Sequence, residues 1–153
     1  MASTDWFTAA RFGMFVHFGI YSGAARHEWV QTNERLTDEN YRQYFENFDP
    51  DLFDAAAIAR TAKQAGMQYA VLTTKHHDGF ALWNTALSDF SAQAVCGRDL
   101  VGEFVAALRA EGLRVGLYFS LIDWHHPDFT IDWVHPRRDD ENAAALNEGR
   151  DMS

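Results

Sequence analysis

Three nearly continuous apolar stretches occur along the chain, and polar side chains follow each of them. The stretches cover residues 11–20, 69–75 and 113–120. Short apolar runs rich in β-branched and aromatic residues are typical of buried strands in parallel sheets. We therefore expect three strands. The second is the best defined, because four ionisable residues and then Gly79 end its apolar pattern abruptly.

Apolar residues at helical spacing lie between the first two strands. Thr37 can cap a helix that runs to about Asn47, and a second helix should follow Asp49-Pro50. Either Asp51 or Asp54 can cap this second helix. The buried face of the first should consist of Tyr41, Tyr44, Phe45 and Phe48, and that of the second of Ile58, Ala62 and Ala65.

A third helix separates the second and third strands. Asp99 can cap it, Gly112 stands at its end, and Leu100, Phe104 and Leu108 share one face. Alternating strands and helices predict an α/β fold with a parallel sheet and right-handed crossovers. Residues 139–152 look weakly helical, and the chain reaches Ser153 without a closing strand.

Polar chemistry gathers where the apolar strands end. Lys75, His76, His77 and Asp78 follow the second strand directly. The carboxyl ends of parallel strands are where α/β folds and barrels place their sites. Because side chains alternate along a strand, Lys75 and His77 should lean to one side and His76 to the other. A solvated polar loop is the alternative, but four clustered ionisable residues favour a site.

Residues on the other two strands would reach the same edge. His17 lies close to the end of the first strand, and Glu28 with Trp29 follows in the next loop. On the third strand, alternation places Tyr118 on the same face as Gly116 and Ser120. Taken alone, His17 is better explained as a core histidine.

Composition and charge narrow the classes of function. Hydrophobic residues make up 47% of the chain and charged residues 23%, which is typical of a globular domain. The net charge of -9 argues against a nucleic-acid partner. Cys96 is the only cysteine, so neither an intrachain disulfide nor a cysteine-based zinc site can form. No apolar run is long enough for a membrane span, and no signal peptide is visible. We expect a cytoplasmic protein, or a secreted or periplasmic one if the chain is incomplete.

Several kinds of active site fit the sequence poorly. The histidines lack the His-x-x-x-His spacing of zinc hydrolases, although His125, His126 and Asp128 offer a weak alternative for a metal-binding loop. The Gly-x-Ser-x-Gly motif of serine hydrolases and a glycine-rich phosphate loop are both missing from the sequence. Carbohydrate hydrolysis fits better, because it combines hydroxyl-binding side chains with a stacking tryptophan.

The ordered motifs resemble glycoside hydrolase family 29, the α-L-fucosidases, over nearly the whole chain. They are Phe-Gly-Met-Phe-Val-His-Phe-Gly at 12–19, Glu-Trp at 28–29, Lys-His-His-Asp-Gly-Phe at 75–80, Arg-Asp-Leu at 98–100 and Gly-Leu-Tyr-Phe-Ser-Leu-Ile-Asp-Trp at 116–124. The resemblance implies a fucosylated glycan or fucoside as substrate, with no metal and no cofactor. It also implies that the fucose pocket is lined by His17, Glu28, Trp29, His76, His77 and Tyr118.

The resemblance further implies that residues 1–153 form the N-terminal part of a (β/α)8-barrel catalytic domain. A complete barrel has eight strands in about 250 residues, so this chain would supply roughly three β/α units of a partial TIM barrel. The nucleophile of the family is expected beyond Ser153, and Glu28 is a weak candidate for the acid/base. The isolated chain should then be inactive and self-associate through open sheet edges. The alternative is a non-catalytic sugar-binding remnant or a truncated gene product.

Overall fold

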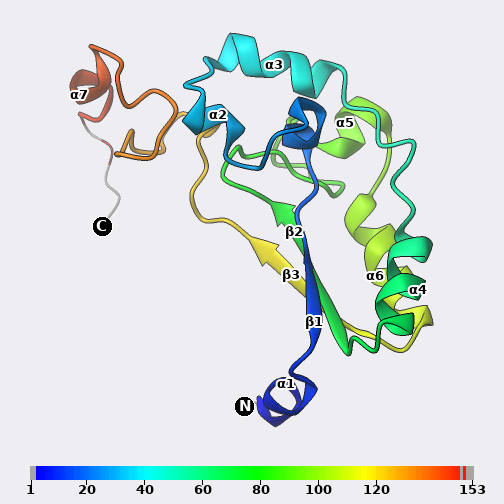
Figure 1. The fold of residues 1–153 in the computed structure, drawn as a ribbon. Helices are drawn as coiled ribbons and strands as arrows, with labels where there is room; N and C mark the ends of the chain where they lie inside the picture. The colour runs from blue at the N-terminus through cyan, green and yellow to red at the C-terminus, as the bar shows by residue number, and fades with distance from the viewer. Residues whose placement is uncertain (1–2, 149, 151–153) are drawn as a thin grey trace.

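A three-stranded parallel sheet forms the centre of the molecule, as the sequence predicts. The computed structural model describes residues 3–148 and 150. Strand β2 (Tyr69–Lys75) lies between β1 (Gly13–Val16) and β3 (Arg114–Phe119), as Figure 1 shows. The bounds of β2 agree with the prediction. In the described part of the chain, every helix is too short or too polar to span a membrane.

Helices cover one face of the sheet. The segment between β1 and β2 contains α3 (Asp38–Glu46) and α4 (Ala55–Gln64), and α5 (Ala92–Cys96) and α6 (Leu100–Ala110) lie between β2 and β3. Helices α4 and α6 lie side by side against the same face (Figure 1). The fully buried core between these helices and β2 consists of Ala59, Ala70, Leu72, Leu100, Phe104 and Leu108.

Side chains cap the three main helices at the predicted positions. Thr37 accepts a hydrogen bond from the Asn40 amide at the start of α3, and Asp99 caps α6 in the same way. The structure decides between the two candidates for α4, because Asp54 accepts from the Ala57 amide. These bonds satisfy amide groups that would otherwise have no partner in the first helical turn.

The first strand and the end of α4 differ from the prediction. Strand β1 covers only Gly13–Val16, because its pairing with β2 ends at Val16 and the 3-10 helix η1 (Ile20–Ala24) soon follows. Residues before β1 form helix α1 (Asp5–Ala10). Ala65 is exposed because α4 ends at Gln64.

Two short helices complete the fold. Helix α2 (Val30–Asn33) follows Trp29, and α7 (Ala143–Leu146) lies within the segment predicted to be weakly helical. Met152, at the end of that predicted segment, lies outside the described residues. In Figure 1 the chain between β3 and α7 passes close to α2. A hydrogen bond from Arg138 to the Thr32 carbonyl ties that segment to α2.

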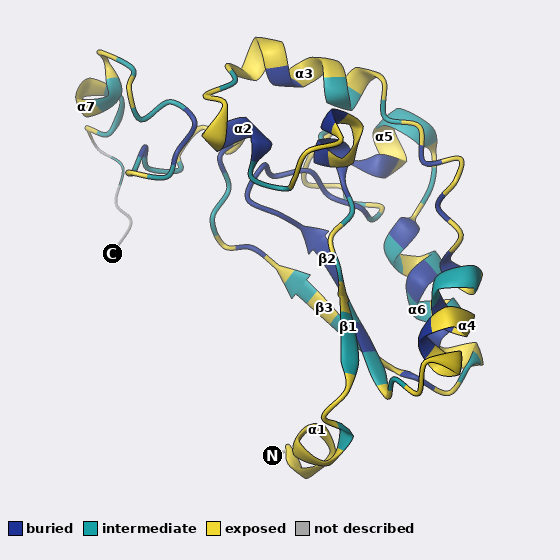
Figure 2. Ribbon diagram, viewed as in Figure 1, coloured by how far each residue is buried: buried dark blue, intermediate teal, exposed yellow. Residues whose placement is uncertain are grey.

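The sheet face opposite α4 and α6 is much less covered. Phe15 on β1 lies on this face and is 51% exposed. Leu117 pairs in register with the buried Leu72, so it lies on the helix side of β3, where it and Phe119 are 53% and 50% exposed at the open edge of the sheet. Figure 2 shows the same contrast, with β2 mostly buried and β3 coloured as exposed or intermediate. The two outer strands therefore present free edges and apolar side chains.

Candidate functional site

His76 and His77 lie in a turn directly after β2, and their rings are neighbours. The ring centroids are 4.3 Å apart, so the expectation that the two side chains diverge is wrong. The reason is local: the strand ends at Lys75, and the Gly79 amide donates to the His76 carbonyl to close a turn. The alternation of a pleated strand does not extend into that turn.

The other side chains implied by the resemblance gather around these two histidines. The ring of His17 lies 5.6 Å from His76, Trp29 lies 4.8 Å from His77, and Tyr118 lies 6.3 Å from His76. Glu28 precedes Trp29 and is close enough to influence the pKa of His77. We call this group the histidine cluster: His17, Glu28, Trp29, His76, His77 and Tyr118.

Exposure varies across the histidine cluster in an ordered way. His76 and His77 are 4% and 8% exposed and form its base. Glu28, Trp29 and Tyr118 are half-buried, and His17 is exposed. A ligand approaching from solvent would therefore meet aromatic and polar side chains first and the two buried imidazoles last.

Three further side chains support the cluster, and sequence reasoning did not assign them to the site. The Tyr21 ring lies 5.6 Å from His76, and its hydroxyl is 3.1 Å from Thr73 Oγ1. The Trp124 ring lies 5.4 Å from His77, and Ser120 Oγ is 2.6 Å from His77 Nδ1. The sequence pattern did not mark Tyr21 as a site residue, because it follows a glycine turn. Ser120 and Trp124 were visible only as residues at the end of the third strand.

Burial keeps both central histidines neutral. Burial first, and then the neighbouring rings of His77 and His17, lower the pKa of His76 to about 3. Burial also lowers the pKa of His77, although Asp132 and Glu28 act in the opposite direction. A neutral imidazole can accept one hydrogen bond and donate another. The base of the cluster is therefore suited to uncharged hydroxyl groups.

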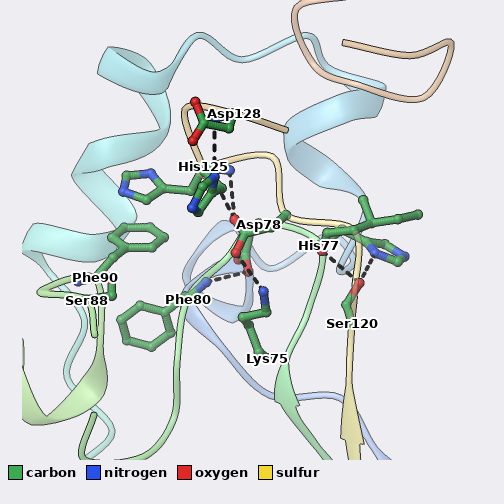
Figure 3. Close-up of polar contacts among 12 residues, drawn as sticks. Lys75, His77, Asp78, Phe80, Ser88, Phe90, Ser120, His125 and Asp128 are labelled. Atoms are coloured by element: carbon green, nitrogen blue, oxygen red, sulfur yellow. Dashed lines mark hydrogen bonds and ion pairs between the residues drawn. The ribbon is translucent and has the colours of Figure 1, made fainter. Parts of the chain in front are cut away.

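An ion pair and a buried carboxyl hold the turn that carries the histidines. Lys75 Nζ donates to Asp123 Oδ2 at 2.6 Å, which joins the end of β2 to the loop after β3. Asp78 is 2% exposed and accepts from the Tyr41 hydroxyl and the Phe80 amide. Figure 3 shows Lys75 and Asp78 beside each other, with His77 and Ser120 at the adjacent strand ends.

The loop after β3 is arranged differently from a metal site. His125 stacks on Phe90 with ring centroids 4.1 Å apart, and His126 Nδ1 accepts from the Asp128 amide. Across residues 3–148 and 150, no three histidine, cysteine or carboxylate side chains are grouped closely enough to hold a metal ion.

Two cavities lie beside the histidine cluster rather than in it. One of about 430 Å³ is lined by Asp78, Tyr41 and Phe90 among others. Another of about 750 Å³ lies between η1 and the helices α3 and α4. Within the described part of the chain, neither is lined by a member of the histidine cluster.

A family model described as Alpha-L-fucosidase matches residues 1–151. The chain belongs to the α-L-fucosidase family. Among solved structures, it is similar to α-L-fucosidase isoenzyme 1 from Paenibacillus thiaminolyticus, with 50% identity and a TM-score of 0.89. That match covers 97% of this chain and 36% of the other. The resemblance of the sequence motifs to family 29 is thereby confirmed.

Two more relatives in the α-L-fucosidase family show the same partial overlap. The tissue α-L-fucosidase of Mus musculus is 38% identical, with 84% of this chain and 32% of that protein covered. The α-L-fucosidase AlfC from Lactobacillus casei, solved in complex with α-L-fucose product, is 31% identical with a TM-score of 0.77. Its match covers 96% of this chain and 55% of that chain. The chain thus spans about a third of the length of the curated relatives it matches.

Proposed function

We propose that this chain is the N-terminal part of the catalytic domain of a retaining α-L-fucosidase, acting on terminal α-L-fucosyl residues of glycans or glycoconjugates. The observation that carries the proposal is the histidine cluster, assembled from three strand ends in a chain of this family. AlfC, a relative in the same family, was solved with α-L-fucose bound.

Each part of the histidine cluster suits a deoxy sugar. His17, His76 and His77 offer imidazole nitrogens to the hydroxyl groups, and Glu28 offers carboxylate oxygens. Trp29 presents an indole face to the apolar side and the methyl group of fucose. Tyr118 completes the group from β3. No cofactor takes part in the proposed reaction.

We also propose that the three strands are the first of a (β/α)8 barrel spanning residues 1–153 and beyond. Parallel strands in sequential order, with α4 and α6 on one face, support this arrangement. In such a barrel the opposite face of the sheet, which carries the exposed Phe15, would be the inner one. The histidine cluster would then lie at the carboxyl ends of the strands, where barrel enzymes place their active sites.

The catalytic carboxylates follow from the retaining mechanism. Retention uses a nucleophile and an acid/base whose carboxyl groups are about 5–5.5 Å apart. We propose that the nucleophile lies beyond Ser153, and Glu28 is the candidate for acid/base within this chain. Residues 1–153 alone should then bind fucose weakly and turn over no substrate.

The proposal is tested in two steps. Sequencing of the gene past codon 153 should reveal a further strand ending in an aspartate. The full-length protein should hydrolyse a chromogenic aryl α-L-fucoside. Proton NMR of the reaction should show α-L-fucose as the first product, with β-L-fucose absent at that stage.

Two results would count against the proposal. Binding of fucose by the full-length protein without turnover would favour the non-catalytic sugar-binding alternative. Release of β-L-fucose first would exclude the retaining mechanism, because inversion needs a wider separation of the two carboxyl groups.

A further inference from the structure

Ser120 lies directly behind His77 at the end of β3, and its hydroxyl makes two short contacts. Ser120 Oγ is 2.6 Å from His77 Nδ1 and 2.8 Å from the carbonyl oxygen of Ile122. Ser120 is 3% exposed and His77 is 8% exposed, so water does not compete freely for these contacts. Figure 3 shows the two side chains facing each other from adjacent strand ends.

The direction of both hydrogen bonds follows from proton counting. A serine hydroxyl has one hydrogen, and a backbone carbonyl oxygen can only accept. The Ser120 hydrogen therefore goes to the Ile122 carbonyl. Ser120 Oγ is left as an acceptor, so His77 Nδ1 must carry the hydrogen. The reverse arrangement would bring two oxygen lone pairs within 2.8 Å of each other in a buried place.

We propose that Ser120 is a positioning residue that holds His77 as the Nδ1–H tautomer, so that Nε2 accepts a hydrogen bond from one hydroxyl of the sugar. The tautomer follows from this chain alone, whereas the identity of the ligand as a fucosyl residue depends on the proposed function.

Other contacts keep the imidazole ring in this orientation. The rings of Trp29 and Trp124 lie 4.8 Å and 5.4 Å from it. The Trp124 amide donates to the His77 carbonyl at 2.7 Å, which ties the backbone of the turn to the loop after β3. Rotation of the ring would have to displace these neighbours and would break the bond to Ser120.

Burial keeps the His77 imidazole neutral despite the charges around it, as the proposed role requires. Burial is the largest influence on its pKa and lowers it, and Lys75 acts in the same direction. Asp132 and Glu28 raise it but do not outweigh burial. The ring of His76 is also adjacent, and it is neutral for the same reason. A neutral ring with its hydrogen on Nδ1 has its free lone pair on Nε2.

This assignment has a consequence for specificity. A site that accepts a hydrogen bond discriminates strongly against an analogue lacking the matching donor, because a buried acceptor is then unpaired. One monodeoxy fucoside should therefore be a poor substrate, and this penalty should depend on Ser120. His77 alone, free to adopt the Nε2–H tautomer, would instead donate to the same position.

The first experiment reads the tautomer without any sugar. Histidine-selective 15N labelling of the full-length protein and two-bond 1H–15N correlations should show His77 Nδ1 protonated and Nε2 unprotonated at neutral pH. In Ser120→Ala the spectrum should shift toward the Nε2–H form. Finding Nε2–H in the unsubstituted protein would overturn the proposal, whatever the enzyme's activity.

The second experiment combines substitution of Ser120 with removal of single hydroxyl groups from the substrate, and compares their effects on kcat/KM alone and together. Ser120→Ala should lower kcat/KM for the parent fucoside by roughly tenfold to a hundredfold, by analogy with side chains that orient a histidine ligand. The penalty for one of the 2-, 3- and 4-deoxy fucosides should shrink in the variant. Ser120→Thr keeps the hydroxyl and should keep both the tautomer and the deoxy penalty. Ser88→Ala, at an exposed serine, is the matched control.

The two experiments separate the proposal from the function on which it rests. An Nδ1–H tautomer in a protein without fucosidase activity would sink the proposed function but leave the role of Ser120 intact. Equal deoxy penalties in the parent and Ser120→Ala would show that the serine does not set the specificity. If Ser120→Ala does not fold, the NMR spectrum of the parent and the kinetics of Ser120→Thr still decide the matter.

Discussion

At the scale of single residues, burial shifts the pKa values of two neighbouring ionisable side chains in one turn in opposite directions. Burial lowers the pKa of His76 to about 3 and raises the pKa of Asp78 to about 6. In both cases burial disfavours the charged form, which for histidine is the protonated one and for aspartate the ionised one. At neutral pH the His76 ring is therefore uncharged where a neutral sugar would be bound, whereas Asp78, with a pKa of about 6, is largely ionised.

His77 is expected to matter more for turnover than for stability. In the full-length protein, His77→Ala should lower turnover of an aryl fucoside by roughly tenfold to a hundredfold, because a substrate hydroxyl loses its partner. The free energy of unfolding should fall by only about 1–2 kcal/mol. His126→Ala, at an exposed histidine of the loop after β3, should change neither. Comparable losses in both properties would favour a structural role for His77.

Asp78 gives a prediction about pH. Its pKa is raised from 3.8 to about 6, by burial first and then by Asp123, while Tyr41, the Phe80 amide and Lys75 oppose the shift. Between pH 4 and 6 the folded chain holds a proton that the unfolded chain has lost. This carboxyl therefore lowers stability as pH rises through that window, by a total on the order of 3 kcal/mol.

Asp78→Asn removes this proton linkage. The stability of the variant relative to the parent should therefore rise as pH increases from 4 to 6. His76 has the opposite effect on stability over pH 3 to 6.5, but it is present in both proteins and cancels in the difference. Urea unfolding at several pH values measures the difference directly. A difference that stays constant with pH would contradict the assigned pKa of Asp78.

At the scale of elements, the turn after β2 and the loop after β3 are fitted closely together. Gly79 has a φ of 82°, and a Cβ atom there would lie 2.4 Å from Asp123 Oδ1. Asp123 is the partner of Lys75, so a displaced carboxylate would also disturb the ion pair. The close approach explains why the turn needs glycine at this position.

Comparing Gly79→Ala with Gly112→Ala separates the cost of the left-handed backbone conformation from the cost of crowding by neighbouring atoms. Both glycines have positive φ, but a Cβ at Gly112 would have no neighbour within 4 Å. Gly112→Ala should cost roughly 1–2 kcal/mol for the left-handed conformation alone. Gly79→Ala should cost roughly 1–3 kcal/mol more, because the added methyl meets Asp123. Urea unfolding of both variants tests this, and equal losses would contradict the crowding argument.

At the scale of the whole molecule, the sheet has two open edges and one thinly covered face. Strands β1 and β3 each pair only with β2 within the described residues. Half-exposed Phe15, Leu117 and Phe119 lie on these outer strands. Unpaired parallel edges next to apolar side chains are prone to association.

The 153-residue chain, expressed alone, is therefore expected to self-associate. Sedimentation velocity at about 50 μM should show species larger than a monomer, because edge strands are templates for pairing with another chain. Leu117→Lys places a charge on the β3 edge and should shift the distribution toward monomer. Leu87→Lys, at a leucine that is 96% exposed in a loop, is the control and should not. A monomer throughout would show that the edges are protected.

Local signals in the sequence were sufficient for most of the elements. The bounds of β2, the caps Thr37 and Asp99 and the buried face of α6 were all predicted correctly. Each depends on residues within one or two turns of chain. The length of β1 was predicted wrongly, because it is set by pairing with β2, more than 50 residues away.

The histidine cluster shows what only the tertiary structure decided. The sequence by itself determined the strand ends, and through the family motifs which side chains would meet there. It did not determine that the rings of His76 and His77 face each other, or that Ser120 meets His77 Nδ1. Those contacts depend on how the chain turns after Lys75 and on the register that brings β3 beside β2. Such geometry is set by hydrogen bonds between distant segments, for which neither periodicity nor composition carries a signal.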